Sequence, residues 1–280
     1  PPRSTLFPYT TLFRSVGSGV TLEYRNPGQA GEATAQLVAV AEDASFLISS
    51  FSAGSTGFEL PVAYDLLDDG VLYASIRDFQ EDRRLTVQLW ERMLRTANEQ
   101  GVRALILDLR NHAGGSTWLA DQLAAYFFDE PLSLGNIGFY DAERDEFVFD
   151  AARAGRFRLP PEELRFRGQV ALLLGPNCAS ACEFFAYNLT LQDRAVTFGH
   201  YPTAGMGGTV ERFRMPGSIV VQMTAGRAVN AQGEIHIEGR GVVPSLRVPL
   251  TLETLLMDGD AVLQAALAVI AENRSEQGAG

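Results

Sequence analysis

The stretch over residues 71–109 constrains the fold most, because strand and helix patterns alternate in it. An alternating segment at 71–76 is followed by apolar residues spaced by four over 85–97, which predict an amphipathic helix. Gly101 is placed as the C-terminal stop of that helix. The apolar run over 102–109 then predicts a buried strand. Strand, helix and buried strand in this order are typical of a βαβ unit, so we predict an α/β fold with a parallel or mixed sheet.

A loop with two glycines follows the buried strand, before a second amphipathic pattern that begins near Thr117. Gly114 and Gly115 would let a substrate oxygen approach backbone N–H groups closely. The same pair is also common in simple tight turns, and that interpretation stays open. His112 lies in this loop as a candidate base, or as a solvent-facing or capping residue.

A second strand-to-helix junction carries the strongest candidate for chemistry. The apolar run at 170–174 predicts a buried strand, and the small residues after it place Ser180 at the turn into a helix. A hydroxyl on such a turn is exposed above the sheet edge, beside the free N–H groups of the first helical turn. Acyl-transfer enzymes hold a nucleophile against an oxyanion hole in this way. Small residues at such a turn can equally serve close packing of strand and helix.

The rest of the chain gives weaker signals. Residues 129–168 are interpreted as an irregular excursion with one short strand near 146–149, placed where it could cover a substrate cleft. A hairpin is predicted over 209–224. On a strand, Glu234, His236 and Glu238 would share one face, as a site or as an ordinary polar strand face.

Composition excludes several classes of function. The net charge of −11 and the pI near 4.8 argue against a nucleic-acid partner or an anionic membrane surface. No apolar run approaches the roughly 18 residues that a membrane span needs. The two cysteines, Cys178 and Cys182, are too few for a zinc site. Because a bridge between positions so close in sequence would strain the turn, we expect them to be buried thiols. No metal and no cofactor are predicted.

The first fifteen residues have no signal-peptide anatomy and no link to the pattern that follows, and they look like translated sequencing-adapter sequence. We therefore expect residues 1–15 to be an artefact and the natural chain to be truncated at its N-terminus. A hairpin is predicted from Val20, with a connector at 49–57. The predicted division is 1–15, then 16–57, then a core at 58–280.

Four motifs in order resemble the C-terminal-processing, or tail-specific, serine peptidase family. They are the strand and Gly-Gly loop at 105–115, the small-residue turn at 177–183, the glycine-rich loop at 199–208 and the Glu-Gly-Arg-Gly-Val-Val-Pro segment at 238–244. The resemblance implies a crotonase/ClpP-like mixed sheet core with flanking helices. It also implies that residues 16–57 are the remnant of a PDZ-like β domain and connector.

Carried over to this sequence, the resemblance makes Ser180 the nucleophile and a polypeptide the substrate. The oxyanion hole would come from the N–H of Ala181 and that of Gly114 or Gly115. In most of the family a lysine in the glycine-rich loop is the general base, but here Met206 stands at that position. The sequence contains no lysine at all, so a Ser–Lys dyad is excluded.

Two explanations for Met206 stay open. The branch of the family that resembles the tricorn core protease uses serine, histidine and glutamate, and its glutamate matches Glu238; its histidine lies upstream of the PDZ-like domain. Alternatively, the protein is an inactive relative that binds peptides or lipophilic ligands. Besides His112, the candidate bases within the chain are His200 and His236, and neither matches the position of the family histidine. Family members are commonly exported, which favours a periplasmic or extracellular location; the oligomeric state is not predicted.

Overall fold

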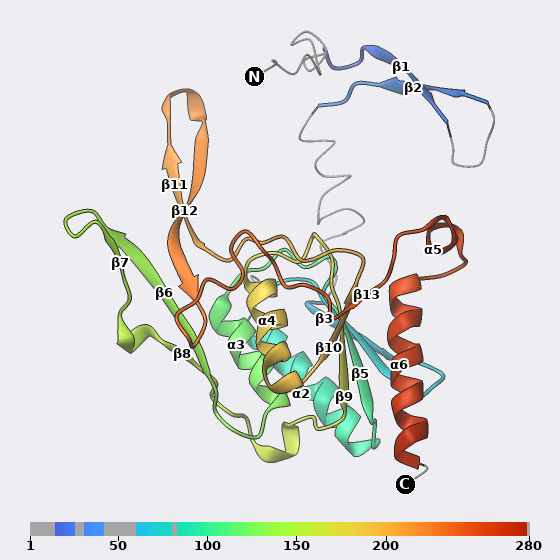
Figure 1. Cartoon of the computed structure of the whole chain (residues 1–280), viewed down its shortest axis with the longest axis vertical. Helices are drawn as coiled ribbons and strands as arrows, with labels where there is room; N and C mark the ends of the chain where they lie inside the picture. The colour runs from blue at the N-terminus through green and yellow to red at the C-terminus, as the bar shows by residue number, and fades with distance from the viewer. Residues whose placement is uncertain (1–14, 26–30, 42–59, 80–82, 279–280) are drawn as a thin grey trace. The chain divides into compact units, whose positions relative to one another are not determined.

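The computed structural model describes residues 15–25, 31–41, 60–79 and 83–278 (Figure 1). The chain divides into two compact units, Pro1–Glu59 and Leu60–Gly280. In the first unit β1 (Gly19–Tyr24) and β2 (Ala33–Val38) pair antiparallel, which confirms the predicted hairpin. Its PDZ-like origin stays a prediction. The expected artefact lies, apart from Ser15, outside the described residues, and the connector at 49–57 lies wholly outside them.

A six-stranded mixed sheet forms the centre of the second unit, in the order β13-β10-β9-β5-β4-β3. Only the β3–β4 pair is antiparallel. The strands are β3 (Val62–Leu66), β4 (Leu72–Ile76), β5 (Ala104–Asp108), β9 (Gln169–Leu173), β10 (Val196–Gly199) and β13 (Leu246–Arg247). With α2 (Arg83–Glu99) between parallel β4 and β5, the predicted βαβ unit and mixed α/β fold are confirmed. The crotonase/ClpP-like description stays a prediction.

Helices cover both faces of this sheet. Alternate residues of a strand point to opposite sides, so a strand of continuous apolar residues presents an apolar surface on each face. Leu105 and Leu107 of β5 join a core with α2, α3 and α4, whereas Ala104 and Ile106 join a second core with α6. Figure 1 shows α6 on one side of the sheet and the other three helices on the opposite side. The remaining helices are α3 (Thr117–Ala124), α4 (Ala181–Thr190), α5 (Leu252–Leu256), α6 (Ala261–Gly278) and the short 3-10 helices η2 (Ala125–Phe127), η3 (Ala151–Arg153), η4 (Glu162–Leu164), η5 (Leu191–Asp193) and η6 (Pro216–Ser218). Among the described helices, none has both the length and the apolar character needed to cross a bilayer.

A second, antiparallel sheet lies beside this core and includes the predicted 209–224 hairpin. Its strands are β6 (Ser133–Asp141), β7 (Glu146–Val148), β8 (Gly155–Arg156), β11 (Thr209–Arg214) and β12 (Val220–Val229). The irregular interpretation of 129–168 was wrong for β6, whose glycines obscured the strand pattern. A Cβ on Gly135 would lie 1.9 Å from the carbonyl oxygen of Val229, so close pairing with β12 requires glycine there.

The loops that carry the candidate site leave the sheet side by side. β5 and β9 are parallel neighbours, with Asp108 opposite Leu173. Because the carboxyl ends of parallel strands meet at one edge, α/β proteins bind ligands there. The loop after β5 holds the two glycines and the loop after β9 holds Ser180, so the topology brings them together.

Candidate active site

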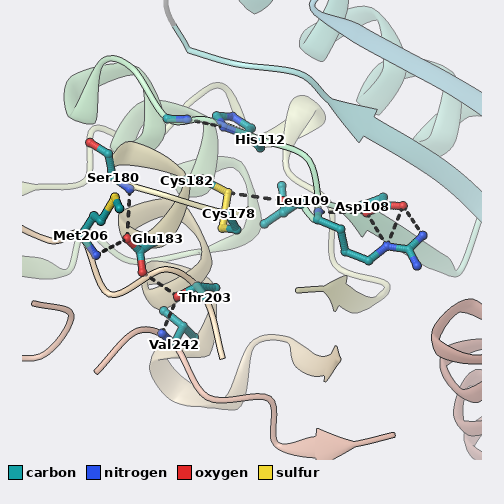
Figure 2. Close-up of a disulfide and its surroundings, with 12 residues drawn as sticks. Asp108, Leu109, His112, Cys178, Ser180, Cys182, Glu183, Thr203, Met206 and Val242 are labelled. Atoms are coloured by element: carbon teal, nitrogen blue, oxygen red, sulfur yellow. Dashed lines mark hydrogen bonds and ion pairs between the residues drawn. A yellow bond between two sulfur atoms is a disulfide. The ribbon is translucent and has the colours of Figure 1, made fainter. Parts of the chain in front are cut away.

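Ser180 is the N-cap of α4 and has an unusual backbone conformation, with φ 54 and ψ −123. A residue with a side chain rarely adopts a positive φ, and such strain concentrates at functional sites. The side chain is partly exposed, and its hydroxyl points away from the Glu183 carboxylate (Figure 2). The structure therefore places Ser180 on a strained strand-to-helix turn, which presents a hydroxyl above the sheet edge.

The Gly-Gly loop lies directly against the Ser180 turn. A Cβ built on Gly114 would lie 2.8 Å from the Ser180 Cβ and 3.1 Å from the Ala181 nitrogen. Gly114 and Gly115 have φ values of 100 and 132, which favour glycine. The Gly114 N–H donates to His112 Nδ1 at 2.9 Å. Within the part of the chain that the structure describes, no hydrogen bond engages the N–H of Gly115 or of Ala181.

The buried carboxylate of Glu183 ties the Ser180 turn to the glycine-rich loop. Its Oε2 accepts the N–H groups of Ser180 at 3.0 Å and Met206 at 2.8 Å. Its Oε1 accepts the Thr203 hydroxyl at 2.6 Å (Figure 2). The same oxygen also accepts the Gly205 N–H at 2.7 Å. Glu183 is not among the site residues predicted from the sequence. An acid three residues after an N-cap serine is typical of a capping box, and that signal could have found it.

Met206 stands where the resemblance places the general-base lysine. Its N–H and that of Ser180 donate to the same oxygen of Glu183, so the two backbones are neighbours. Figure 2 shows the Met206 side chain beside Ser180, and 61% of the residue is exposed. A thioether is only a weak hydrogen-bond acceptor and cannot serve as a general base. Met206 therefore lies where the resemblance places the lysine, beside Ser180, but it cannot accept the serine proton.

His112 is fully buried and held away from a role as a proton acceptor for Ser180. Its ring packs against Phe79, with centroids 4.2 Å apart. Burial lowers the pKa of His112 to about 4, so the imidazole is neutral at pH 7. Nδ1 accepts the Gly114 N–H, and Nε2 has no hydrogen-bond partner among the described residues. In this structure His112 orients the Gly-Gly loop.

The buried His112 makes stability depend on pH. Its pKa is about 4 in the folded state and near 6.5 in the unfolded chain, so the unfolded state binds its proton first as pH falls. Replacing His112 by Gln keeps an acceptor and removes this titration. Between pH 7 and pH 5, we expect wild type to lose about 2 kcal/mol of unfolding free energy relative to His112→Gln. Urea unfolding of both proteins measures it.

The difference between the two proteins is the informative quantity, because other groups titrate in the same window. Burial raises the pKa of Asp121 to about 6, which favours the folded state as pH falls and opposes His112 in wild type. Burial lowers the pKa of His236, which acts in the same direction as His112. Both effects cancel in the comparison. A difference that stays constant from pH 7 to pH 5 would show that His112 is not held neutral by the fold.

The other two histidines have different surroundings. His200 Nδ1 lies 2.8 Å from the carbonyl oxygen of Val248. The His236 ring packs against Tyr187, with centroids 4.3 Å apart. Within the described residues, no hydrogen bond joins either histidine to Ser180. No group of three His, Cys, Asp or Glu side chains gathers there as metal ligands would.

The predicted strand that would align Glu234, His236 and Glu238 is not present. Residues 230–245 form turns and irregular backbone, in which Asn230 Oδ1 accepts the N–H of Glu234 at 2.9 Å. Glycines at 233, 239 and 241 have positive φ and break the extended pattern. Glu238 is half-buried: its Oε1 accepts the Thr224 hydroxyl at 3.4 Å, and its covered Oε2 has no hydrogen-bond partner in the described part of the chain.

Cys178 and Cys182 form a disulfide that spans the Ser180 turn, so the prediction of free thiols was wrong. The two Cα atoms lie 5.5 Å apart, within the usual range of about 4.4–6.8 Å. Residues four apart approach this closely because the chain reverses at Ser180 before entering α4. Both cysteines are fully buried.

Removing this disulfide is expected to lower the free energy of unfolding by about 2 kcal/mol, the loop-closure entropy of so short a loop. The measurement is urea unfolding of the Cys178→Ser, Cys182→Ser double variant beside oxidised wild type. Fully reduced wild type should match the double variant. If dithiothreitol changed neither the midpoint nor the slope for wild type, the bridge would not contribute to stability.

A model of peptidase family S41 matches residues 70–248 of this chain. The chain belongs to peptidase family S41. That family is one of serine peptidases, and the match confirms the family resemblance of the four motifs. It spans the Gly-Gly loop, Ser180, Met206 and Glu238. It does not decide between the Ser/Lys and Ser/His/Glu branches.

Solved structures share the fold at low sequence identity. A peptidase-like protein from Parabacteroides merdae has a TM-score of 0.62 and 20% identity, over 77% of this chain and 67% of that one. Mature CPAF complexed with lactacystin has a TM-score of 0.60 and 17% identity, over 86% and 65%. The photosystem II D1 C-terminal processing protease has a TM-score of 0.51 and 18% identity, over 84% and 56%. The aligned part of this S41 chain thus spans about two thirds or less of these relatives.

Proposed function

We propose that this chain carries the catalytic core of a serine-type endopeptidase of the tail-specific kind, with Ser180 as nucleophile. The observation that carries the proposal is the backbone of Ser180, whose φ of 54 and ψ of −123 are retained at the N-terminus of a buried helix. Strain of this kind persists only where the surrounding structure imposes it. Here the Glu183 carboxylate, the disulfide and the Gly-Gly loop all hold the turn.

In the proposed reaction the Ser180 hydroxyl oxygen attacks a peptide carbonyl carbon and transfers its proton to a general base. The tetrahedral oxyanion accepts hydrogen bonds from backbone N–H groups before the C–N bond breaks. The base then returns the proton to the leaving amine, and water hydrolyses the acyl-enzyme. The N–H groups of Ala181 and Gly115 are the favoured donors, since Gly114 would first have to release His112.

The general base is assigned to a histidine N-terminal to the described core, as in the Ser/His/Glu branch. Three facts support this assignment. Met206 cannot accept the proton, and the three histidines within the chain make contacts that do not include Ser180. Glu238 has a buried Oε2 without a partner among the described residues, which suits a carboxylate that orients an imidazole. Glu238 would position the base rather than accept the proton itself.

The wider setting is part of the same proposal. Residues 16–57 are assigned to the end of a PDZ-like domain and its connector. The disulfide supports an oxidising location, periplasmic or extracellular, because such bonds rarely persist in the cytosol. The substrate is a polypeptide.

The test uses full-length protein and a fluorophosphonate probe, which reacts with activated serine nucleophiles. We expect one adduct, located by mass spectrometry on the peptide that contains Ser180. The Ser180→Ala variant should take up no probe and should lose on the order of 10⁴-fold or more in peptide cleavage. Undiminished cleavage by Ser180→Ala would refute the serine mechanism.

The alternative is an inactive relative that binds peptides or lipophilic ligands, and Met206 together with the engaged Gly114 N–H favours it. Such a protein would take up no fluorophosphonate at full length and would still bind its ligand. A wild-type protein that remains unlabelled while Ser180→Ala binds peptide equally well would therefore replace the peptidase assignment with the binding one.

A further inference from the structure

A pocket opens between α3, α4 and β6. Its volume is about 110 Å³, enough for an extended side chain. Its lining is mixed: Ile137, Phe184 and Val229 are among its apolar side chains, and its polar side chains are those of Thr117, Asp121, Asn136, Arg153 and Asn188. Gly155 also lines it, and a Cβ there would lie 3.2 Å from the Leu134 Cβ, so the glycine keeps the space open.

The pocket runs away from the nucleophile along two helices. α4 begins directly after Ser180, and its lining residues Phe184 and Asn188 follow one and two turns later, about 6 and 12 Å along the axis. α3 begins with Thr117, close behind the Gly-Gly loop that touches Ser180, and Asp121 follows one turn later. A substrate side chain next to the scissile carbonyl would therefore enter past Phe184 and Thr117 and reach Asp121 and Asn188.

The carboxylate of Asp121 is half-buried and has one oxygen in use. Asn188 Nδ2 donates to its Oδ1 at 2.8 Å, which fixes the orientation of the carboxylate. Its Oδ2 has no hydrogen bond, and no arginine forms an ion pair with Asp121 within the described residues. Arg153 also lines the pocket, but its side chain is 69% exposed and lies 3.6 Å from Asp150.

A desolvated carboxylate without a cation is costly, and burial accordingly raises the pKa of Asp121 to about 6. Groups perturbed in this way and facing a pocket are characteristic of functional sites. A lining that offers apolar side chains together with a carboxylate suits the long basic side chains, whose methylene stems pack on apolar surface while the charged head is paired.

We propose that this pocket receives the side chain of the substrate residue whose carbonyl Ser180 attacks, and that Asp121 selects arginine or lysine there. The assignment rests on the proposed peptidase function, because it uses Ser180 as the point from which the pocket is reached. Asn188 is a positioning residue that holds Asp121 Oδ1 and leaves Oδ2 for the cation.

The experiment measures peptide binding to full-length Ser180→Ala by fluorescence anisotropy, so that no cleavage is needed. Three labelled hexapeptides differ only in the C-terminal residue: arginine, citrulline, which is its uncharged isostere, and norleucine. We expect the arginine peptide to bind about 10- to 100-fold more tightly than the citrulline peptide, the worth of a charge-assisted hydrogen bond in a desolvated pocket. Adding Asp121→Asn should bring the two affinities to within about threefold while leaving the norleucine peptide unchanged.

Asp65→Asn is the matched control, since it removes one carboxylate from an exposed position on β3 outside the pocket. It should keep the full preference for arginine. Equal binding of the arginine and citrulline peptides would overturn the assignment without requiring any pocket variant to fold. A preference for arginine that survives Asp121→Asn would overturn it as well.

Cleavage by wild-type protein separates this inference from the proposed function. Substrates with arginine, citrulline or norleucine before the scissile bond should show the same ranking in kcat/KM. If the peptides bind with the arginine preference but none is cleaved, the peptidase assignment fails and the pocket assignment stands. If substrates are cleaved without regard to charge at this residue, the pocket assignment fails and the peptidase assignment stands.

Discussion

Replacing Glu183 by glutamine is expected to lower the free energy of unfolding by about 3 kcal/mol and peptidase activity by at least about 100-fold. Four donors converge on the two carboxylate oxygens, and three of them are backbone N–H groups. A glutamine places its NH₂ group against at least one of these N–H groups, whichever way the amide is turned. Two donors then face each other in a buried site, and the Ser180 turn or the Met206 loop must move.

Urea unfolding and the rate of fluorophosphonate labelling measure the two effects of Glu183→Gln. The control is Glu99→Gln, because Glu99 is exposed at the end of α2 and its replacement should change stability by no more than about 0.5 kcal/mol. Equal unfolding free energies for the two variants would mean that the Glu183 network does not hold the turn. Normal labelling of a destabilised Glu183→Gln would separate stability from the positioning of Ser180.

The layers of the core were predictable because periodicity follows from backbone geometry. Apolar spacing by four over residues 85–97 corresponds to α2, which extends only two residues further at each end. The uninterrupted apolar run before Asp108 indicated a strand covered on both faces, and the structure places helices on both. Signals of this kind are local, so a single sequence contains them in full.

The errors of sequence reasoning have specific physical causes. β6 was missed because Gly135 and Gly138 interrupt its strand pattern, although Gly135 is what lets β12 approach. The disulfide was rejected on sequence separation, whereas a turn with positive φ at Ser180 brings the two Cα atoms to a normal distance. The Glu234–Glu238 alternation looked extended, but left-handed glycines on both sides turn the chain.

Contacts between residues distant in sequence were not available from any pattern. Met206 is 23 residues from Glu183, and Asn188 is 67 residues from Asp121, yet each pair is joined by a hydrogen bond. Motif order could indicate that the Gly-Gly loop and the serine turn belong to one site. Only the folded chain reveals that Glu183 organises this site and that Asp121 lines the pocket between α3, α4 and β6.

Replacing Gly114 by alanine tests the closest approach in the site. A Cβ there would lie 2.5 Å from the carbonyl oxygen of Ala179 and 2.8 Å from the Ser180 Cβ, whereas real Cβ contacts under 3.0 Å essentially never occur. These atoms belong to the nucleophile turn and cannot rotate away as a flexible side chain would. The turn itself must shift, and its disulfide and its hydrogen bonds to Glu183 resist that shift. We expect Gly114→Ala to lose about 3 kcal/mol of unfolding free energy and about 10²- to 10³-fold in labelling rate and peptide cleavage.

Gly101→Ala is the matched control for Gly114→Ala, because Gly101 has a φ of 66 but no atom within 4 Å of the added Cβ. It isolates the conformational penalty of an alanine at positive φ, which is about 1 kcal/mol, and it should leave labelling and cleavage unchanged. Whatever Gly114→Ala loses beyond Gly101→Ala therefore measures the contact between the Gly-Gly loop and the Ser180 turn together with the larger backbone strain of alanine at a φ of 100. Equal losses in the two variants would mean that the Gly-Gly loop can move away from the Ser180 turn at little cost. The loop and the turn could then not form one preorganised oxyanion site.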